Sequence, residues 1–114
     1  QNAYYSDFRF VKGTAVYTAN FTPPTSELTD ISGTVLLCCK SSSSAAAADV
    51  APSSIAAKGD SQSSTQSPFD TNSGVWIDRS DGQYMYTLND SGIQFGTGDF
   101  TCECWFMWHS NNND

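Results

Sequence analysis

The chain has 114 residues, of which 39% are hydrophobic and only 15% charged, with five Lys and Arg against twelve Asp and Glu. A chain of this length forms one domain at most. Its net charge of −7 repels phosphate backbones and anionic membrane surfaces, and its basic residues form no cluster. Nucleic acid is therefore not an expected partner. Membrane insertion is not expected either, because no apolar run is long enough to span a bilayer.

The first predicted element is a strand from Ala3 to Val11, because apolar and polar residues alternate along it. Strict alternation would place its side chains on two faces, with Tyr4, Phe8 and Phe10 on one and Tyr5, Asp7, Arg9 and Val11 on the other. Residues 15–21 are expected to form a turn or a single helical turn. Its apolar side chains should pack back onto the sheet, namely those of Val16, Tyr17 and Phe21.

The middle of the chain is expected to contain one buried strand and long polar connecting segments. Pro23 and Pro24 favour an extended path, so residues 22–32 are expected to be a connector. Residues 33–40 form a continuous apolar run and predict a second strand. The Ser- and Ala-rich residues 41–48 and the Ser-, Gln- and Thr-rich residues 61–67 read as loop or linker, and residues 55–57 as a brief edge strand.

Residues 75–88 predict a hairpin, since two short apolar runs, 75–77 and 84–88, flank a turn signal at 78–82. The densest apolar stretch follows at 95–108. Gly96 and Gly98 form a turn with Asp99, and alternation from Phe100 predicts a strand. One face of this strand is apolar throughout, which predicts a central position covered on both sides, and it consists of Phe100, Cys102, Cys104, Phe106 and Trp108. Short strands separated by turns indicate an all-β fold, an antiparallel β-sandwich.

Four cysteines occur as the adjacent pair Cys38 and Cys39 and the alternating pair Cys102 and Cys104. Their spacing does not match a zinc motif, and His109 has no evident partner motif. Two interpretations stay open. The cysteines are either buried reduced thiols on strands or partners in disulfides between the two pairs, which would need an oxidising compartment.

Two segments resemble a known domain type. Residues 95–106, FGTGDFTCECWF, resemble the entry strand of the concanavalin A-like, laminin-G-like jelly-roll domains in virion proteins of bacteriophages, notably marine ones. Residues 5–24, YSDFRFVKGTAVYTANFTPP, resemble the closing strand and exit segment of the same domains. The two matches cover about a third of the chain. The cysteines at 102 and 104 depart from the pattern, in which aliphatic or aromatic residues are more usual.

The order of these matches implies a junction between tandem modules. Residues 1–32 would be the closing strand and exit segment of a preceding β-sandwich module, and residues 33–114 the first half of a following concanavalin A-like module. By the same resemblance, residues 55–60 form a strand and turn and residues 41–48 a loop. The chain is then expected to be a piece of a longer polypeptide. Missing strands would leave apolar edges such as 100–108 exposed.

The resemblance implies a structural virion component, in the capsid or a tail appendage, rather than an enzyme. Its partners would be other virion proteins or copies of itself, with host surface glycans as a further contact, and its location the virion. An alternative is a lectin module for host adsorption, whose stacking residues would be Trp76, Tyr84, Tyr86 and also Trp105. The competing interpretation of these aromatics is core packing.

The sequence contains residue types that suit two further kinds of site. Some relatives of the fold bind calcium with loop carboxylates, and turn aspartates here are Asp78, Asp81, Asp90 and Asp99. They follow no known loop spacing for the six to eight oxygens that calcium needs, so no cofactor is expected. A third function, endoglycanase, would use Glu103, but glycoside hydrolysis needs two facing carboxylates and Trp105 stands at the i+2 position.

Overall fold

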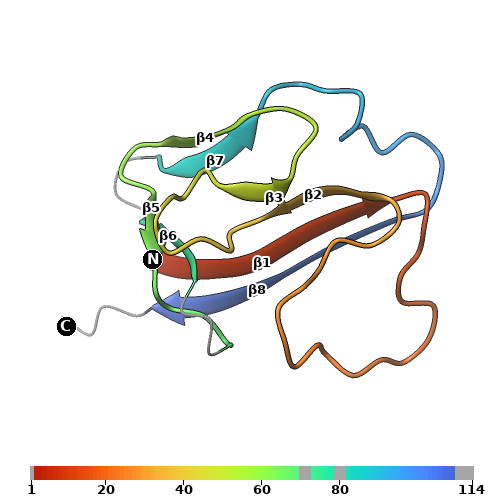
Figure 1. Cartoon of the computed structure of the whole chain (residues 1–114), viewed down its shortest axis with the longest axis horizontal. Coiled ribbons are helices and arrows are strands. Elements are labelled where there is room, and N and C mark those ends of the chain that lie inside the picture. The colour runs from red at the N-terminus through yellow and green to blue at the C-terminus, as the bar shows by residue number, and fades with distance from the viewer. Residues whose placement is uncertain (1, 70–72, 79–81, 110–114) are drawn as a thin grey trace.

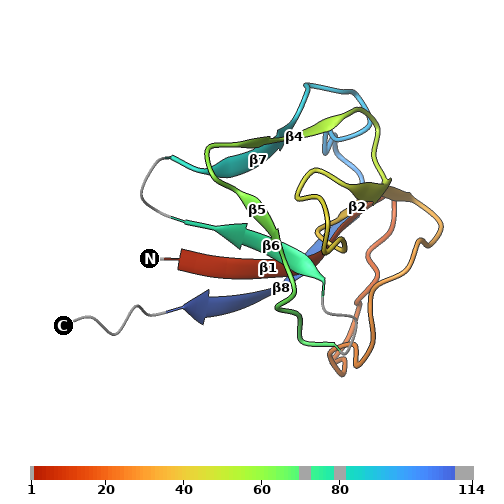
Figure 2. The ribbon, with the colours of Figure 1, turned by 60° about the vertical axis from the view of Figure 1, so that its left-hand side comes forward.

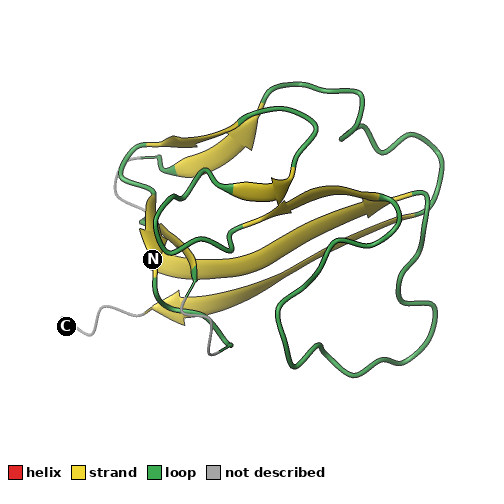
Figure 3. Cartoon of the chain, viewed as in Figure 1, coloured by secondary structure: helices red, strands yellow, loops and turns green. Residues whose placement is uncertain are grey.

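The computed structural model describes residues 2–69, 73–78 and 82–109. Within these ranges the chain contains strands, turns and loops and no helix (Figure 3). All strand pairs are antiparallel, and they form a six-stranded sheet and a two-stranded sheet. The predicted all-β, sandwich-like fold class is therefore confirmed.

The larger sheet is built around β1 (Asn2–Lys12), the longest strand (Figure 1). On one side β1 pairs along its length with β8 (Phe100–His109), from Asn2 opposite His109 to Lys12 opposite Phe100. On the other side it pairs with two short strands, which are β2 (Thr34–Cys38) at its far end and β6 (Gly74–Ile77) at its start. The sheet continues beyond β2 with β3 (Ala48–Val50) and beyond β6 with β5 (Gln62–Ser64).

The smaller sheet consists of β4 (Ile55–Lys58) and β7 (Tyr84–Thr87), and it lies over one face of the larger sheet (Figure 2). We call this the inner face. A core of buried residues lies there, formed by Cys38, Cys39, Ala45 and Val75, with Phe8, Leu36, Ile55, Ile77 and Met85 packed against it. The opposite face carries polar contacts to the segment 13–33, and we call it the loop face.

A β-bulge in β1 overturns the predicted assignment of its faces. Ser6 pairs with Trp105 and Arg9 with Glu103, so β1 uses three steps where β8 uses two. Asp7 absorbs the extra residue with a φ of 53°. The bulge exchanges the two faces beyond it. Phe8 and Phe10 therefore share the inner face with Tyr5 rather than with Tyr4, and Arg9 and Val11 share the loop face with Ser6 and Tyr4.

The predicted strand at 100–108 is present, but its expected central position is wrong. Within the described residues β8 pairs with β1 alone, so it is an edge strand. The face that was expected to be covered is largely open, with Phe106 67% and Trp108 54% exposed. The reason is the small second layer, because β4 and β7 have four residues each and cover the inner face mainly over β2 and β6.

Some of the other predicted elements are confirmed by the structure, and others are wrong. The strands at 33–40 and 55–57 and the turn at Gly96 are confirmed. The predicted loop at 41–48 is confirmed except for its last residue, Ala48, which begins β3. The hairpin at 75–88 is wrong, because β6 belongs to the large sheet and β7 to the small one. Part of the expected linker 61–67 is β5, which gains backbone partners from β6 despite its polar sequence. Residues 15–21 form an irregular loop.

Candidate functional site

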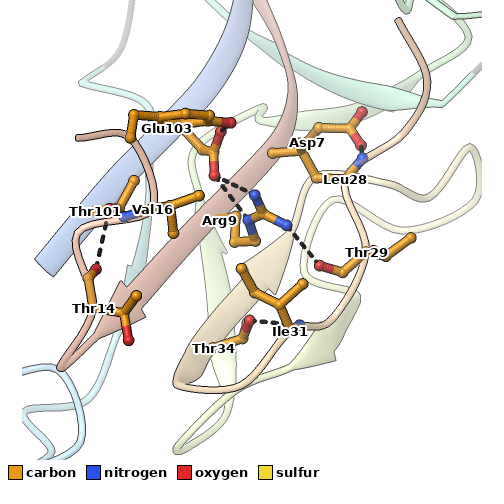
Figure 4. Close-up of polar contacts among 11 residues, drawn as sticks. Asp7, Arg9, Thr14, Val16, Leu28, Thr29, Ile31, Thr34, Thr101 and Glu103 are labelled. Carbon is orange, nitrogen blue, oxygen red and sulfur yellow. Dashed lines mark hydrogen bonds and ion pairs between the residues drawn. The ribbon is translucent and has the colours of Figure 1, made fainter. Parts of the chain in front are cut away.

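A largely buried ion pair joins β1 to β8 on the loop face (Figure 4). The Arg9 side chain donates from Nε to Glu103 Oε1 at 2.8 Å and from Nη1 to the carbonyl oxygen of Thr29 at 2.9 Å. Nη2 donates to the same Glu103 oxygen, and the Tyr17 hydroxyl donates to Glu103 Oε2. Both carboxylate oxygens of Glu103 thus accept hydrogen bonds that join β8 to β1 and to the segment 13–33. The residue that was the candidate for acid–base catalysis therefore has a structural role.

Further hydrogen bonds hold the segment 13–33 against the loop face. The Val16 amide donates to Thr101 Oγ1 at 2.8 Å, and the Lys12 amide donates to the Gly33 carbonyl oxygen at 2.8 Å. The Tyr17 hydroxyl reaches Glu103, so the predicted return of this loop to the sheet is confirmed for Val16 and Tyr17. It is wrong for Phe21, which is 55% exposed and stacks on Tyr17 with ring centroids 4.0 Å apart. We call the segment 13–33 the strap, because hydrogen bonds hold it near both of its ends.

Asp7 is the most buried charged residue described, with no exposed surface. Its carboxylate accepts a hydrogen bond from the Leu28 amide at 2.7 Å (Figure 4). It accepts another from the Ser6 hydroxyl at 2.6 Å. Burial raises the pKa of Asp7 above its ordinary value of 3.8, although both hydrogen bonds oppose the shift. Asp is also one of the few residues that tolerate the positive φ of the bulge.

We expect Asp7 to make the stability of the fold depend on pH. Since its folded-state pKa is raised, the native state holds this proton more tightly than the unfolded chain. Stability from this group is therefore full below pH 3.8 and is lost as pH rises through the folded-state pKa. Asp7→Asn should remove that loss, so the variant gains on the natural chain by up to about 1.4 kcal/mol per pH unit within the window.

Urea unfolding between pH 3.5 and neutrality measures this difference. Asn keeps an oxygen for the Leu28 amide and tolerates the positive φ, which makes it a conservative replacement. Asp30→Asn, at an exposed carboxylate, is the matched control. Parallel stability curves for the natural chain and Asp7→Asn would rule out the proposed role of Asp7.

An apolar groove of about 450 Å³ opens between the two sheets on the inner face. Sulfur atoms from three strands and a loop border it, those of Cys38, Cys39, Met85 and Cys104. Cys38 Sγ lies 3.7 Å from Cys39 Sγ, and Cys39 Sγ lies 4.0 Å from Met85 Sδ. The thiol contact lowers the pKa of Cys38 and, together with burial, raises that of Cys39. All four cysteines carry free thiols, with the first pair buried as one interpretation expected and the second pair exposed.

The aromatic residues singled out for sugar stacking do not form one site. Tyr84 and Tyr86 lie together on the outer surface of β7, 45% and 46% exposed, with ring centroids 5.8 Å apart. Trp76 lies on the loop face, since its neighbours Val75 and Ile77 point to the inner face, and its ring packs 4.4 Å from that of Tyr4. Trp105 packs edge-on against Phe69 at 5.7 Å.

The candidate calcium ligands stay in separate turns. The backbone amide of Asp78 donates to Gln83 Oε1, Asp90 Oδ1 accepts from the Gly92 amide, and the carbonyl oxygen of Asp99 accepts from the Gly13 amide. Asp81 lies outside the described residues. In the described part of the chain, no three His, Cys, Asp or Glu side chains gather closely enough to hold a metal ion.

Five large apolar side chains are exposed along β8 and at the turn before it, on both faces of the strand. They are 48–67% exposed, and we call them together the β8 apolar surface, formed by Phe95, Phe100, Phe106, Met107 and Trp108. Phe95 and Phe100 contact each other, with ring centroids 4.6 Å apart. Monomeric proteins rarely expose so many neighbouring large apolar side chains. The sequence supported two expectations for 100–108, a covered central strand and, for a piece of a longer polypeptide, an exposed apolar edge, and the structure has the exposed edge.

Two of the structural sites were not found from the sequence. The Asp7 and Arg9 network could have been suspected from two charges inside an otherwise aromatic strand. The sulfur convergence could not, because it joins Cys39 to Met85, 46 residues apart. None of the described residues forms a helix that could cross a membrane. Comparisons with protein-family models, curated proteins and solved structures found no match.

Proposed function

We propose that this chain is a structural component of a bacteriophage virion, in the capsid or a tail appendage, built from concanavalin A-like jelly-roll modules. It acts through protein–protein attachment. The observation that carries the proposal is the β8 apolar surface, with Phe106 67% exposed on a strand that pairs on one side only among the described residues. The resemblance of residues 5–24 and 95–106 to such virion domains supplies the biological setting.

The physical argument is that β8 offers both an apolar face and an edge. An edge strand presents unpaired backbone donors and acceptors, which another β-strand can satisfy. Apolar burial then stabilises the contact by about 25 cal/mol per Å². β8 is ten residues long and carries Glu103 as its single charged side chain, which already pairs with Arg9. Nothing in its charge therefore opposes a neighbouring strand.

A photo-crosslinking experiment on purified particles tests this function. With the photoreactive residue p-benzoylphenylalanine in place of Phe106, irradiation should join the chain to a virion subunit or to further sequence of its own polypeptide. Phe21, which is 55% exposed on the strap, takes the same residue as a matched control and should give a weak or different product. The proposal fails if Phe106 yields no product, or yields only host proteins that do not belong to the particle.

The tyrosine pair of β7 favours one alternative, a lectin module that contacts host glycans. Tyr84 and Tyr86 are exposed side by side, and Lys58 Nζ lies 5.3 Å from the centroid of the Tyr84 ring. A glycan array separates the two functions. Saturable binding that a free sugar competes away, and that Tyr86→Ala abolishes while Phe21→Ala does not, would establish the lectin. A purely structural subunit shows no such binding.

A further inference from the structure

Three sulfur atoms lie close together in the apolar groove between the two sheets. They belong to Cys38 at the end of β2, to Cys39 just after it and to Met85 on β7, and we call them the sulfur cluster. The sulfur atoms of Cys38 and Cys39 lie 3.7 Å apart, and those of Cys39 and Met85 lie 4.0 Å apart. The cluster therefore joins the large sheet to the small one.

The backbone is bent to make this arrangement. Neighbouring residues of a regular strand point to opposite faces, so Cys38 and Cys39 would normally be separated by the sheet. Cys39 instead has a φ of 63°, in the left-handed region that costs a residue with a side chain about 1–2 kcal/mol. Both thiols consequently face the same groove, and both are buried. Such strain is characteristic of residues with a function.

The candidate metal ligands of the sulfur cluster are three sulfur atoms, which are soft donors. Soft sulfur ligands favour Cu(I), Zn²⁺ and iron–sulfur clusters. Structural Zn²⁺ sites take four ligands that are thiolate, imidazole or carboxylate, so a set of two thiols and one thioether fits Cu(I) better. If each metal–sulfur bond is about 2.3 Å, as for zinc thiolates, three sulfurs around a trigonal ion lie about 4 Å apart. The separations of Cys39 from Cys38 and from Met85, 3.7 and 4.0 Å, match two of the three edges of such a site.

The surroundings fit the same ion. The groove walls are mostly apolar and include Tyr5, Phe8, Leu36, Ile55 and Ile77. An apolar shell around a metal ion limits the access of solvent and lowers the local dielectric constant. The groove is nevertheless open to solvent, so an ion can reach the sulfurs without unfolding the chain. Cys104 of β8 lines the same groove.

We propose that Cys38, Cys39 and Met85 form a binding site for one Cu(I) ion. Two thiolates and one thioether coordinate the ion, and two protons leave the thiols as it enters. No electron is transferred in this step. The site is independent of the attachment surface, because it lies between the two sheets and the β8 apolar surface lies along the open edge.

Anaerobic titration of the reduced chain with Cu(I), in competition with the chromophoric chelator bathocuproine disulfonate, tests the site. One equivalent should bind, and X-ray absorption should show sulfur neighbours only. Cys38→Ser and Cys39→Ser should each weaken binding by at least about a hundredfold, and Met85→Leu by at least about tenfold. Cys102→Ser, at an exposed thiol, should leave the affinity unchanged.

Met85→Leu keeps the experiment decisive, because Leu replaces the thioether with an apolar side chain of similar volume and preserves the packing. Far-UV circular dichroism verifies that each variant is folded. The proposal is overturned if the chelator retains all the copper, if Cys102→Ser weakens binding as much as Cys39→Ser, or if Met85→Leu leaves it unchanged. Tighter binding of Zn²⁺ than of Cu(I) in the same assay would also overturn it.

Discussion

Replacing Glu103 with Ala is expected to lower the free energy of unfolding by about 3–5 kcal/mol, because it removes one partner of a buried ion pair. The Arg9 side chain is 7% exposed and that of Glu103 15%. Without the carboxylate, the guanidinium keeps a hydrogen bond to the Thr29 carbonyl oxygen and little else to offset its lost hydration. Urea unfolding followed by circular dichroism measures the change.

Two further variants separate charge from packing. Tyr17→Phe removes only the hydroxyl that donates to Glu103, so it should cost about 1 kcal/mol. The double variant Arg9→Met with Glu103→Leu leaves no unpaired charge and should recover most of the stability lost in Glu103→Ala. If Glu103→Ala is as stable as the natural chain, the ion pair does not hold the loop face together.

Replacing Leu37 with Ala is expected to cost about 2–5 kcal/mol, the range for a buried leucine whose removal leaves a cavity. Leu37 is 1% exposed and pairs with Arg9 across β1 and β2. It therefore lies on the loop face, where the fully buried Val11 also points. The small chain has few such residues, so each one carries a large share of the stability.

Leu88→Ala is the matched control for this variant, since Leu88 is 65% exposed and the same atoms are removed there. It should change stability by less than about 0.5 kcal/mol. Urea midpoints of the two variants, measured together, give the contrast directly. Equal midpoints for Leu37→Ala and Leu88→Ala would show that the loop face contains no real core.

The strands were predictable where local pattern determines them. The alternation along β1 and β8 and the apolar run of β2 follow from side-chain periodicity, which is visible in a single sequence. The position of β8 at the edge was not predictable. It depends on which strands lie over its apolar face, and the small sheet is formed by residues 55–58 and 84–87, far from it in the chain.

The bulge and the sulfur cluster show a second limit of sequence reasoning. One positive φ at Asp7 exchanges the faces of β1 beyond it, and one at Cys39 turns two adjacent thiols to the same side. Neither residue is a glycine, so the usual sequence signal for a positive φ is missing. Long-range contacts stabilise both conformations, such as the hydrogen bond from the Leu28 amide to Asp7.

The pairing of Asn2 with His109 determines how the molecule responds to mechanical force. The first described strand begins where the last one ends, so both ends of this antiparallel pair lie at one pole of the sheet (Figure 1). A tension applied between those ends pulls β1 and β8 apart like a zipper and loads their hydrogen bonds one after another. The same bonds would resist together if the chain were pulled lengthwise, from opposite poles. A force applied through these two ends therefore separates β1 from β8 in the direction in which their hydrogen bonds resist least.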